Sequence, residues 1–225
     1  MAQWDFAELK RLCYVNNREF PDDFLQSLPD KQLQIQFHVE EAERIFKDIF
    51  KKSSELGDEK QGEALVRYIS HIECCVNALR SMIDILMQVI NVVILDKEAF
   101  PAKDVTFGHV EKGVMKNPEY SNVSKSLDLL IKDKSFIYIN AFNNFNKHRG
   151  SLLFHNTFSA EFGKDKRNEW GVEYKNFILN NREYPSMWGS DIIGIHRKQI
   201  MDLILKIGVA INEDMKNQWY QLIRL

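Results

Sequence analysis

The sequence predicts a mainly α protein, an antiparallel helical bundle with a β-hairpin inserted before the C-terminal helix. First, the stretch from Glu63 to Asp96 is a long apolar run, and between Ser81 and Leu95 its only formal charge is Asp84. A run of this length is typical of a buried helix rather than a strand. Second, apolar residues elsewhere recur at helical spacing. Third, only the region of about 151–184 is rich in alternating aromatic residues, which favours strands.

Composition limits the class of protein. The chain has 225 residues, of which 44% are hydrophobic, so we expect a single helical domain over residues 1–225 with an ample core. The net charge of −2 gives no general bias toward DNA or an anionic membrane. Three cysteines, two of them adjacent (Cys74 and Cys75), indicate reduced thiols in the cytoplasm. Their spacing suggests no zinc site, so we expect no metal and no cofactor.

Neither a secretory signal nor a membrane span is expected. The first residues carry acids and lack an apolar signal core. Within the apolar run, Asp84, Gln88 and Asn91 interrupt the stretch, which is too short to cross a bilayer comfortably. The sequence therefore predicts a cytoplasmic protein without a membrane partner.

The N-terminal half predicts three helices. A short amphipathic helix runs from Trp4 to Val15 and ends at two asparagines. Pro29 opens a second helix, which extends to about Leu56. A turn at Gly57 then leads into the central helix, so these two long helices are expected to be antiparallel neighbours. The apolar positions assigned to the second helix are Leu33, Phe37, Ile45, Phe46 and Ile49.

Beyond the central helix, Pro101 is a stop signal. A looser connection follows, with a helix around residues 105–116 and another over residues 121–132. Asp133 or Ser135 is expected to cap the next helix, which closes at Gly150.

The pattern then changes to strands. SLLFHNTFSAEF and WGVEYKNFILNNREYP are separated by the turn signal GKDKRN, which predicts the β-hairpin. A final helix is expected from Ile192 to about Trp219, and its assigned buried positions are Ile195, Ile200, Leu203, Ile204, Ile207, Val209 and Ile211.

One polar stripe crosses the central helix at alternating steps of four and three residues, which place its members on one helix face. It consists of Asn77, Ser81, Asp84, Gln88 and Asn91. The stripe is either a solvated face or an inter-helix or dimer-interface stripe, and the short side chains favour the second reading. If Asp84 is buried, it needs a cation or several hydrogen-bond donors.

The helix over residues 135–149 presents the second candidate face. Its polar residues Asn140, Asn144, Lys147 and His148 fall at i, i+4, i+7 and i+8, and Arg149 follows near the helix C-terminus, where the dipole favours cations. If the two faces meet, Asp84 would find a cation in Lys147, Arg149 or its own neighbour Arg80.

This hypothesis defines a polar inter-helix cleft. Its candidate catalytic residues are His148, Arg149, His155 and Asp84, and its candidate substrate-binding residues are Lys147, Asn144, Asn140 and Ser81. His148 has two readings, a capping residue that bonds a last-turn carbonyl or a general acid/base. Lys147 and Arg149 are either surface cations or ligands of a phosphate.

The two polar helices and the ending NFNKHRG resemble the HEPN-type helical bundles, whose hallmark is an arginine, four to six residues, and a histidine. Arg149 and His155 satisfy that spacing. The resemblance implies a homodimer and, for many members, a metal-independent ribonuclease of toxin or phage-defence systems. The Asn-x-x-Lys-His-Arg ending, Asn144 to Arg149, is also similar to that of an uncharacterised group of bacterial helical proteins, which implies no activity.

Two functions therefore compete. The first is a non-catalytic binding or interaction protein whose polar stripe orders a helix pair or a dimer. The second is a ribonuclease in which His148 or His155 moves a proton while Arg149 and Lys147 hold the phosphate. In that reading RNA is the substrate and its 2′-hydroxyl the nucleophile.

Overall fold

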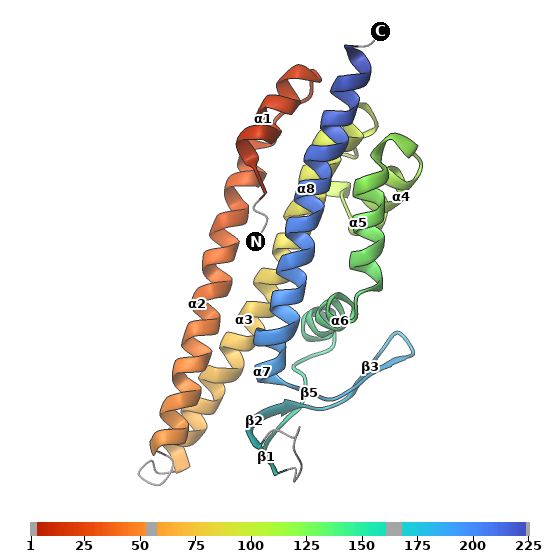
Figure 1. The fold of residues 1–225 in the computed structure, drawn as a ribbon. Coiled ribbons are helices and arrows are strands. Elements are labelled where there is room, and N and C mark those ends of the chain that lie inside the picture. The colour runs from red at the N-terminus through yellow and green to blue at the C-terminus, as the bar shows by residue number, and fades with distance from the viewer. Residues whose placement is uncertain (1–3, 53–57, 161–167, 224–225) are drawn as a thin grey trace. The chain divides into compact units, whose positions relative to one another are not determined.

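The computed structural model describes residues 4–52, 58–160 and 168–223. The fold is mainly helical, with a small antiparallel sheet inserted before the C-terminal helix (Figure 1). The predicted fold class is thus confirmed. The turn GKDKRN lies outside the described residues except for its last residue, Asn168.

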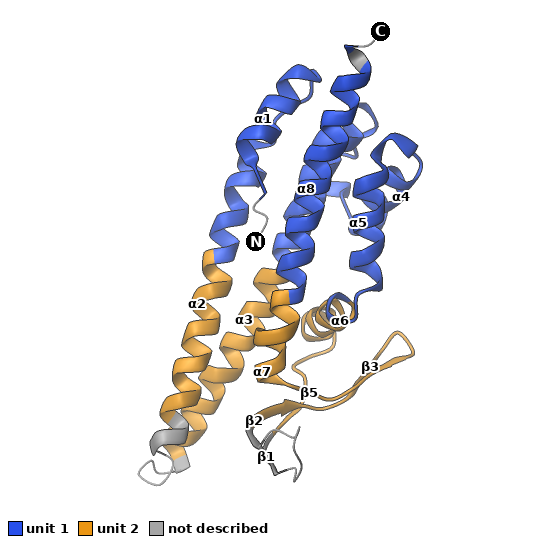
Figure 2. Ribbon diagram, in the orientation of Figure 1, with its two compact units in different colours: residues 1–32, 81–136, 199–225 blue, residues 33–80, 137–198 orange. Residues whose placement is uncertain are grey.

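The chain forms two compact units, each built from segments that are far apart in the sequence (Figure 2). Unit 1 comprises Met1–Gln32, Ser81–Phe136 and Gln199–Leu225, and unit 2 comprises Leu33–Arg80 and Ile137–Lys198. Helices α2 (Asp22–Lys52), α3 (Asp58–Ile90), α6 (Lys134–His148) and α8 (Arg197–Leu222) each contribute to both. The single domain expected from the sequence stays a prediction.

Unit 1 begins with α1 (Phe6–Val15), capped by Asp5, whose carboxylate accepts a hydrogen bond from the backbone N–H of Glu8 at 2.9 Å. Parts of α2, α3 and α8 pack with it, together with α4 (Phe107–Met115) and α5 (Ser121–Lys132). The shorter helical turns of this unit are η1 (Asn91–Leu95), η2 (Asp96–Glu98), η3 (Ala102–Asp104) and η4 (Pro118–Tyr120).

The π-helix η1 ends the central helix, and buried Asn91 fixes the chain that follows it. The Asn91 side-chain amide donates to the carbonyl of Phe100 at 2.9 Å, and its oxygen accepts from the Phe100 N–H at 2.8 Å. Gln88 donates to the carbonyl of Ala102 at 3.1 Å. Two members of the predicted polar stripe therefore satisfy the backbone of a connection that has no regular ladder of its own.

In unit 2, α2 and α3 are neighbours, as the sequence predicts. His38 Nδ1 lies 2.9 Å from His71 Nδ1, and the Phe46 and Tyr68 rings are 5.6 Å apart between centroids. The sheet follows α6: β1 (Phe154–Ala160) pairs antiparallel with β2 (Asn168–Tyr174), and the short β5 (Met187–Trp188) pairs with the other edge of β2. The turns α7 (Gly189–Asp191) and η5 (Ile192–His196) then lead into α8.

A second hairpin, which the sequence reading missed, extends the strand region. Strands β3 (Phe177–Leu179) and β4 (Arg182–Tyr184) pair antiparallel. They are joined by Asn180 and Asn181, with φ of 52° and 61°. Two successive positive φ values form the type I′ turn that closes tight hairpins, and asparagine tolerates them best among non-glycine residues. The segment predicted as one strand therefore folds back on itself.

Two predictions about α2, its first residue and its buried face, are wrong. It begins at Asp22 rather than at Pro29, which lies inside the helix and only removes the hydrogen bond to the carbonyl of Leu25. Leu33 and Phe37, assigned to the buried face, are 68% and 55% exposed. They are four residues apart and so share a face, but the packed face is a neighbouring one: Ile35, Val39, Ala42 and Ile45.

Other predicted boundaries hold. Asp133 caps α6 by accepting from the N–H of Ser135 at 2.8 Å, and Gly150 follows the helix with φ of 109°, which favours glycine. Ile195, expected in the buried face of the last helix, is 54% exposed; it lies in the π-turn η5, whose packed residues are Ile192 and Ile193. The stretch Glu59–Glu98 is long and apolar enough to cross a membrane, so the expectation that this run is too short for a bilayer is wrong. However, 67% of its most apolar window is buried within the fold. That burial is consistent with the core helix of a soluble protein.

Candidate functional site

The polar stripe of α3 has no single role. Gln88 and Asn91 bond the backbone that follows the helix, whereas Asn77 and Asp84 are exposed and Ser81 is half-buried. Asp84 is therefore not the buried carboxylate that the sequence reading considered. Gln88 and Asn91 are thus structural, whereas the inter-helix or dimer-interface reading of the stripe stays a prediction.

The asparagines of α6 serve mainly to pack unit 2. Asn140 accepts a hydrogen bond from Arg80 Nε at 3.0 Å. Asn146 accepts from the Leu152 N–H at 3.1 Å, which ties the chain after Gly150 back to the helix, and its amide also bonds the Glu73 carboxyl. Asn144, a predicted binding residue, is half-buried.

The predicted cations lie on the surface. Lys147, His148 and Arg149 are exposed, and Arg149 lines a shallow pocket beside the β3–β4 turn. The other lining residues of this pocket are Phe145, Ile178, Leu179, Asn180 and Asn181. His155 is exposed in β1, directly opposite Glu173 of β2.

The predicted cleft would need residues from both units. Lys147, Arg149 and His155 belong to unit 2, as does Asn140, whereas Asp84 belongs to unit 1 with Ser81. The pairing of Asp84 with the basic cluster therefore stays a prediction.

The buried acid of this protein is a different residue, Asp214 of α8, which is 1% exposed. Its carboxylate accepts from the Asn122 side-chain amide at 2.7 Å, from the Val123 N–H at 2.9 Å and from the Asn122 N–H at 3.3 Å. It thus caps the N-terminus of α5 from another helix. Burial raises the pKa of the Asp214 carboxyl, and these hydrogen bonds offset part of the rise. In the sequence, the burial of Asp214 could have been inferred from its position seven residues after Ile207, which places it on the apolar face of the last helix.

The contact between His38 and His71 is a second feature that the sequence analysis does not anticipate. Their ring centroids are 5.2 Å apart while the two Nδ1 atoms are 2.9 Å apart, so both nitrogens lie near the line that joins the rings. This is the geometry of a head-on N–H···N hydrogen bond, in which one ring donates and the other accepts. Burial first, and the charge of His71 second, lower the pKa of His38.

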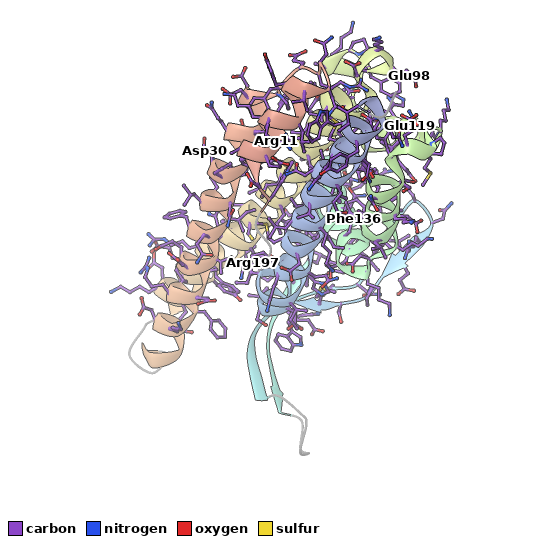
Figure 3. The ribbon with its side chains drawn as sticks, turned by 45° about the horizontal axis from the view of Figure 1, so that its top comes forward. Arg11, Asp30, Glu98, Glu119, Phe136 and Arg197 are labelled. Carbon is purple, nitrogen blue, oxygen red and sulfur yellow. The ribbon has the colours of Figure 1, made fainter. Side chains whose placement is uncertain are left out.

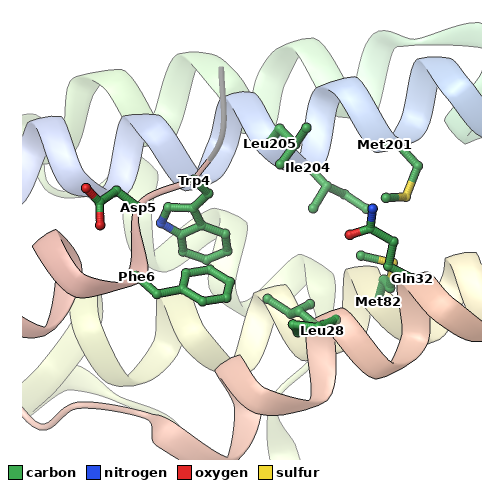
Figure 4. A pocket seen from close by; sticks show the side chains of 10 residues that line it. Trp4, Asp5, Phe6, Leu28, Gln32, Met82, Met201, Ile204 and Leu205 are labelled. Carbon is green, nitrogen blue, oxygen red and sulfur yellow. The ribbon is translucent and has the colours of Figure 1, made fainter. Parts of the chain in front are cut away.

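A mainly apolar pocket lies wholly in unit 1. We call it the Trp4 pocket; its volume is about 630 Å³. Figure 4 shows the Trp4 and Phe6 rings at one end and Met82, Met201 and Gln32 at the other. The full lining is Trp4, Asp5, Phe6, Leu28, Pro29, Gln32, Met82, Met201, Ile204 and Leu205.

The sequence dictates one wall of this pocket through Gly208. A Cβ at position 208 would lie 2.2 Å from the Trp4 ring, so only glycine leaves room for the indole against α8. Trp4 Nε1 also donates to Asn212 Oδ1 at 3.2 Å, and the Asn212 amide donates to the Asp5 carbonyl at 2.9 Å. The Trp4 ring stands edge-on to Phe6, with centroids 4.9 Å apart.

The polar groups of the Trp4 pocket are few. The Asp5 carboxylate is engaged by the Glu8 N–H, and the indole N–H by Asn212. Gln32, which is exposed, is the remaining polar side chain of the lining and has no hydrogen bond within the part of the chain that the structure describes. An apolar cavity with one amide at its end suits a largely apolar molecule with a single neutral polar group.

Comparison with known proteins identifies no relative: no family model, no curated protein and no solved structure matches the chain. Among the described residues, no group of three or more His, Cys, Asp or Glu side chains is arranged to hold a metal ion.

Proposed function

We propose that this chain is a helical binding protein whose ligand is a small, largely apolar molecule held in the Trp4 pocket. The observation behind the proposal is the cavity itself. Its volume of about 630 Å³ falls within the range of small-molecule sites, and its lining is mostly aromatic and aliphatic. The binding role agrees with one of the two functions expected from the sequence, although the site is not the polar cleft expected there.

The chemistry of the lining narrows the ligand. Met82 and Met201 are flexible, polarisable side chains that adapt to irregular apolar shapes. Trp4 and Phe6 offer a rigid aromatic wall, fixed by Gly208 and Asn212. Gln32 can both donate and accept, so it fits a hydroxyl, carbonyl or amide better than a charged group. We therefore infer a neutral ligand with one polar end.

A neutral apolar dye tests the proposal directly. We expect Nile red to bind saturably with one-to-one stoichiometry and decan-1-ol to displace it. Leu205→Glu would place a carboxylate in the pocket wall and should reduce Nile red affinity at least tenfold. The matched control is Leu129→Glu, because Leu129 of α5 is 58% exposed and does not line the pocket.

Circular dichroism would confirm that both variants retain their helices. Equal Nile red affinity for Leu205→Glu and the wild type would contradict the proposal. Stronger displacement by decanoate than by decan-1-ol would contradict the neutral polar end.

A metal-independent ribonuclease of the HEPN type is the second candidate. It is favoured by the exposure of Lys147, His148, Arg149 and His155 within unit 2. A histidine would take the proton of the RNA 2′-hydroxyl, whose oxygen attacks phosphorus; the P–O5′ bond breaks and the 5′-oxygen is protonated. Arg149 and Lys147 would stabilise the charge on the phosphorane oxygens, and a homodimer would bring two such sets together.

Incubation of RNA with the protein in EDTA separates the two functions. Cleavage that disappears in His148→Ala or His155→Ala, but persists in His109→Ala, would support the ribonuclease. His109 is also exposed but belongs to unit 1. Intact RNA at high protein concentration would contradict the ribonuclease and favour the binding protein. Sedimentation of the same sample would test the homodimer that the ribonuclease requires.

A further inference from the structure

The contact between His38 and His71 brings two imidazole nitrogens together on unit 2. His38 belongs to α2 and His71 to α3, and the two helices lie side by side in both views (Figure 1 and Figure 3). The two residues are 33 positions apart in the sequence, whereas their Nδ1 atoms are 2.9 Å apart. Both side chains are half-buried, so the pair is in reach of solutes.

The protonation of the pair leaves nitrogen lone pairs for a metal ion. Burial first, and the charge of His71 second, lower the pKa of His38, so His38 is neutral at neutral pH. A neutral imidazole carries its proton on either ring nitrogen and is the commonest metal ligand in proteins. When both protons lie on Nε2, the two Nδ1 lone pairs face each other and repel, and a cation bound by both nitrogens removes the repulsion.

The distance between the two nitrogens suits a shared metal ion. Imidazole nitrogens bind first-row divalent metals at about 2.0–2.1 Å, so two ligands at a right angle lie about 2.9 Å apart and two tetrahedral ligands about 3.3 Å apart. The observed 2.9 Å fits the right angle, which is typical of Cu²⁺ and Ni²⁺ sites. The ion would lie beside the line that joins the nitrogens. Each ring would therefore turn about its Cβ–Cγ bond, a torsion that is broad in histidine.

The neighbours of the pair restrict its rings and favour a cation. The Phe37 ring stands edge-on to both imidazoles, with centroids 5.3 Å from His38 and 6.0 Å from His71. Glu41 lies one turn after His38. Its hydrogen bond to Arg44 is the main cause that lowers the pKa of Glu41, and the charge of His71 contributes. The carboxylate is therefore close enough to His71 to attract a cation held there, although Arg44 offsets part of the attraction.

Two imidazoles do not complete the coordination of such an ion. Within residues 4–52, 58–160 and 168–223, no group of three or more His, Cys, Asp or Glu side chains is arranged around a metal position. Water would supply the remaining ligands, which is feasible because the pair is only half-buried. The affinity should accordingly be lower than that of a site with three or four protein ligands.

From this geometry we propose that His38 and His71 form a site for one divalent transition-metal ion, with their Nδ1 atoms as adjacent ligands. On binding, the proton between the rings moves through solvent to Nε2, so both imidazoles stay neutral. The ion joins α2 to α3 within unit 2. The site is independent of the Trp4 pocket, which lies in unit 1 and contains neither histidine.

Titration calorimetry with Ni²⁺ at neutral pH tests the proposal. We expect one Ni²⁺ per chain at the tightest site. His38→Gln and His71→Gln should each weaken its binding by at least about tenfold, because a single imidazole lacks the chelate effect. His109→Gln is the matched control and should leave the affinity unchanged, since His109 is exposed in unit 1. Unchanged affinity in His38→Gln or His71→Gln, or equal weakening by His109→Gln, would overturn the proposal.

A spectroscopic measurement covers the case in which a histidine variant does not fold, which circular dichroism would reveal. One equivalent of Cu²⁺ is added to Cys74→Ser, which removes an exposed thiol that would reduce the ion. Electron spin echo modulation of the bound Cu²⁺ should show two imidazole ligands. A spectrum with one imidazole or none would identify an adventitious ion only and would overturn the proposal.

Discussion

The buried Asp214 and Tyr120 of unit 1 differ in their hydrogen bonding from the buried tyrosines of unit 2. In unit 1 the buried Asp214 carboxylate receives three hydrogen bonds, and the buried Tyr120 hydroxyl accepts one from Arg18. In unit 2 the hydroxyls of Tyr138 and Tyr174 and the side-chain oxygen of Asn143 are buried without a hydrogen-bond partner among the described residues. Asp214 and Tyr120 therefore join elements of unit 1 through hydrogen bonds, whereas Tyr138, Tyr174 and Asn143 are held mainly by the apolar packing around them. The difference belongs to these groups and not to the whole units, because Asn16 Oδ1 and Gln88 Oε1 of unit 1 also lack a partner among the described residues, and Asn140 and Asn146 of unit 2 accept hydrogen bonds.

Burial shifts pKa values in unit 2 as it does at Asp214 in unit 1. The Tyr174 hydroxyl is fully enclosed, so burial raises its pKa well above the ordinary value, and Glu73 adds to the rise. Burial likewise raises the pKa of Tyr138 and of Glu73, although Asn146 offsets part of the shift at Glu73. Removing the hydrogen-bonded Asp214 carboxylate or Tyr120 hydroxyl should therefore be costly, whereas removing the Tyr174 hydroxyl, which has no partner among the described residues, should be almost free.

The largest effect is expected from Asp214→Ala. The change leaves the first N–H groups of α5 and the Asn122 amide buried without an acceptor, so the free energy of unfolding should fall by about 3 kcal/mol. Urea denaturation measures it. Asp128→Ala, which removes only the exposed pair with Lys132, should cost less than about 0.5 kcal/mol. Similar losses for the two variants would contradict the claim that the buried hydrogen bonds of Asp214 stabilise the fold.

Gly208→Ala tests how tightly unit 1 is packed. Alanine improves helix propensity by about 1 kcal/mol, but its methyl group overlaps the Trp4 ring, and overpacking costs about 1–3 kcal/mol. We expect a net loss of about 1 kcal/mol and weaker Nile red binding.

Gly189→Ala is the counterpart in unit 2. Its methyl group would meet the far end of the Ile72 side chain, which can move more easily than an indole. A greater loss of thermal stability in Gly189→Ala than in Gly208→Ala would refute this ranking.

The histidine pair predicts a pH dependence in unit 2. Because the folded pKa of His38 is lowered, the unfolded chain binds its proton first as the pH falls below about 6.5. The stabilising contribution is therefore present above pH 6.5 and is lost on acidification through the lower folded pKa. The slope of unfolding free energy between pH 7.5 and 5.5 should be positive and should decrease in His38→Gln. An unchanged slope in that variant would exclude His38 as its source.

The smallest effect is expected from Tyr174→Phe. Since its hydroxyl has no partner among the described residues, deletion should leave stability unchanged or raise it by up to about 1 kcal/mol. Tyr120→Phe is the matched change in unit 1, and it should cost about 1 kcal/mol because Arg18 loses an acceptor. Thermal unfolding of the two variants compares them. A loss in Tyr174→Phe as large as in Tyr120→Phe would contradict the distinction between a buried hydroxyl that has a hydrogen-bond partner and one that has none.

Much of the fold could be read from local sequence. The central apolar helix, the Asp133 cap, the stop at Gly150 and the paired strands β1 and β2 all follow from periodicity, capping and backbone preference, which act over a few residues. The Asn180–Asn181 turn could have been predicted in the same way, because two adjacent asparagines favour positive φ. The sequence analysis instead placed both asparagines within a strand.

The candidate sites could not be read in this way. Periodicity groups Leu33 with Phe37, but it does not tell which face meets a neighbour, and these two are exposed. Spacing placed Asp84 on a polar stripe and gave it the role of the key acid, whereas the acid that is buried and bonded is Asp214. The Trp4 pocket joins residues about 200 positions apart, which no local pattern indicates.

The sequence by itself determined where helices and strands form, because propensity, caps and turn residues act on neighbouring positions of the chain. Tertiary structure decided which side chains became buried, which polar groups found partners and where cavities remained. Those outcomes depend on desolvation and packing between segments remote in sequence, such as Gly208 against Trp4 and Asp214 against Val123.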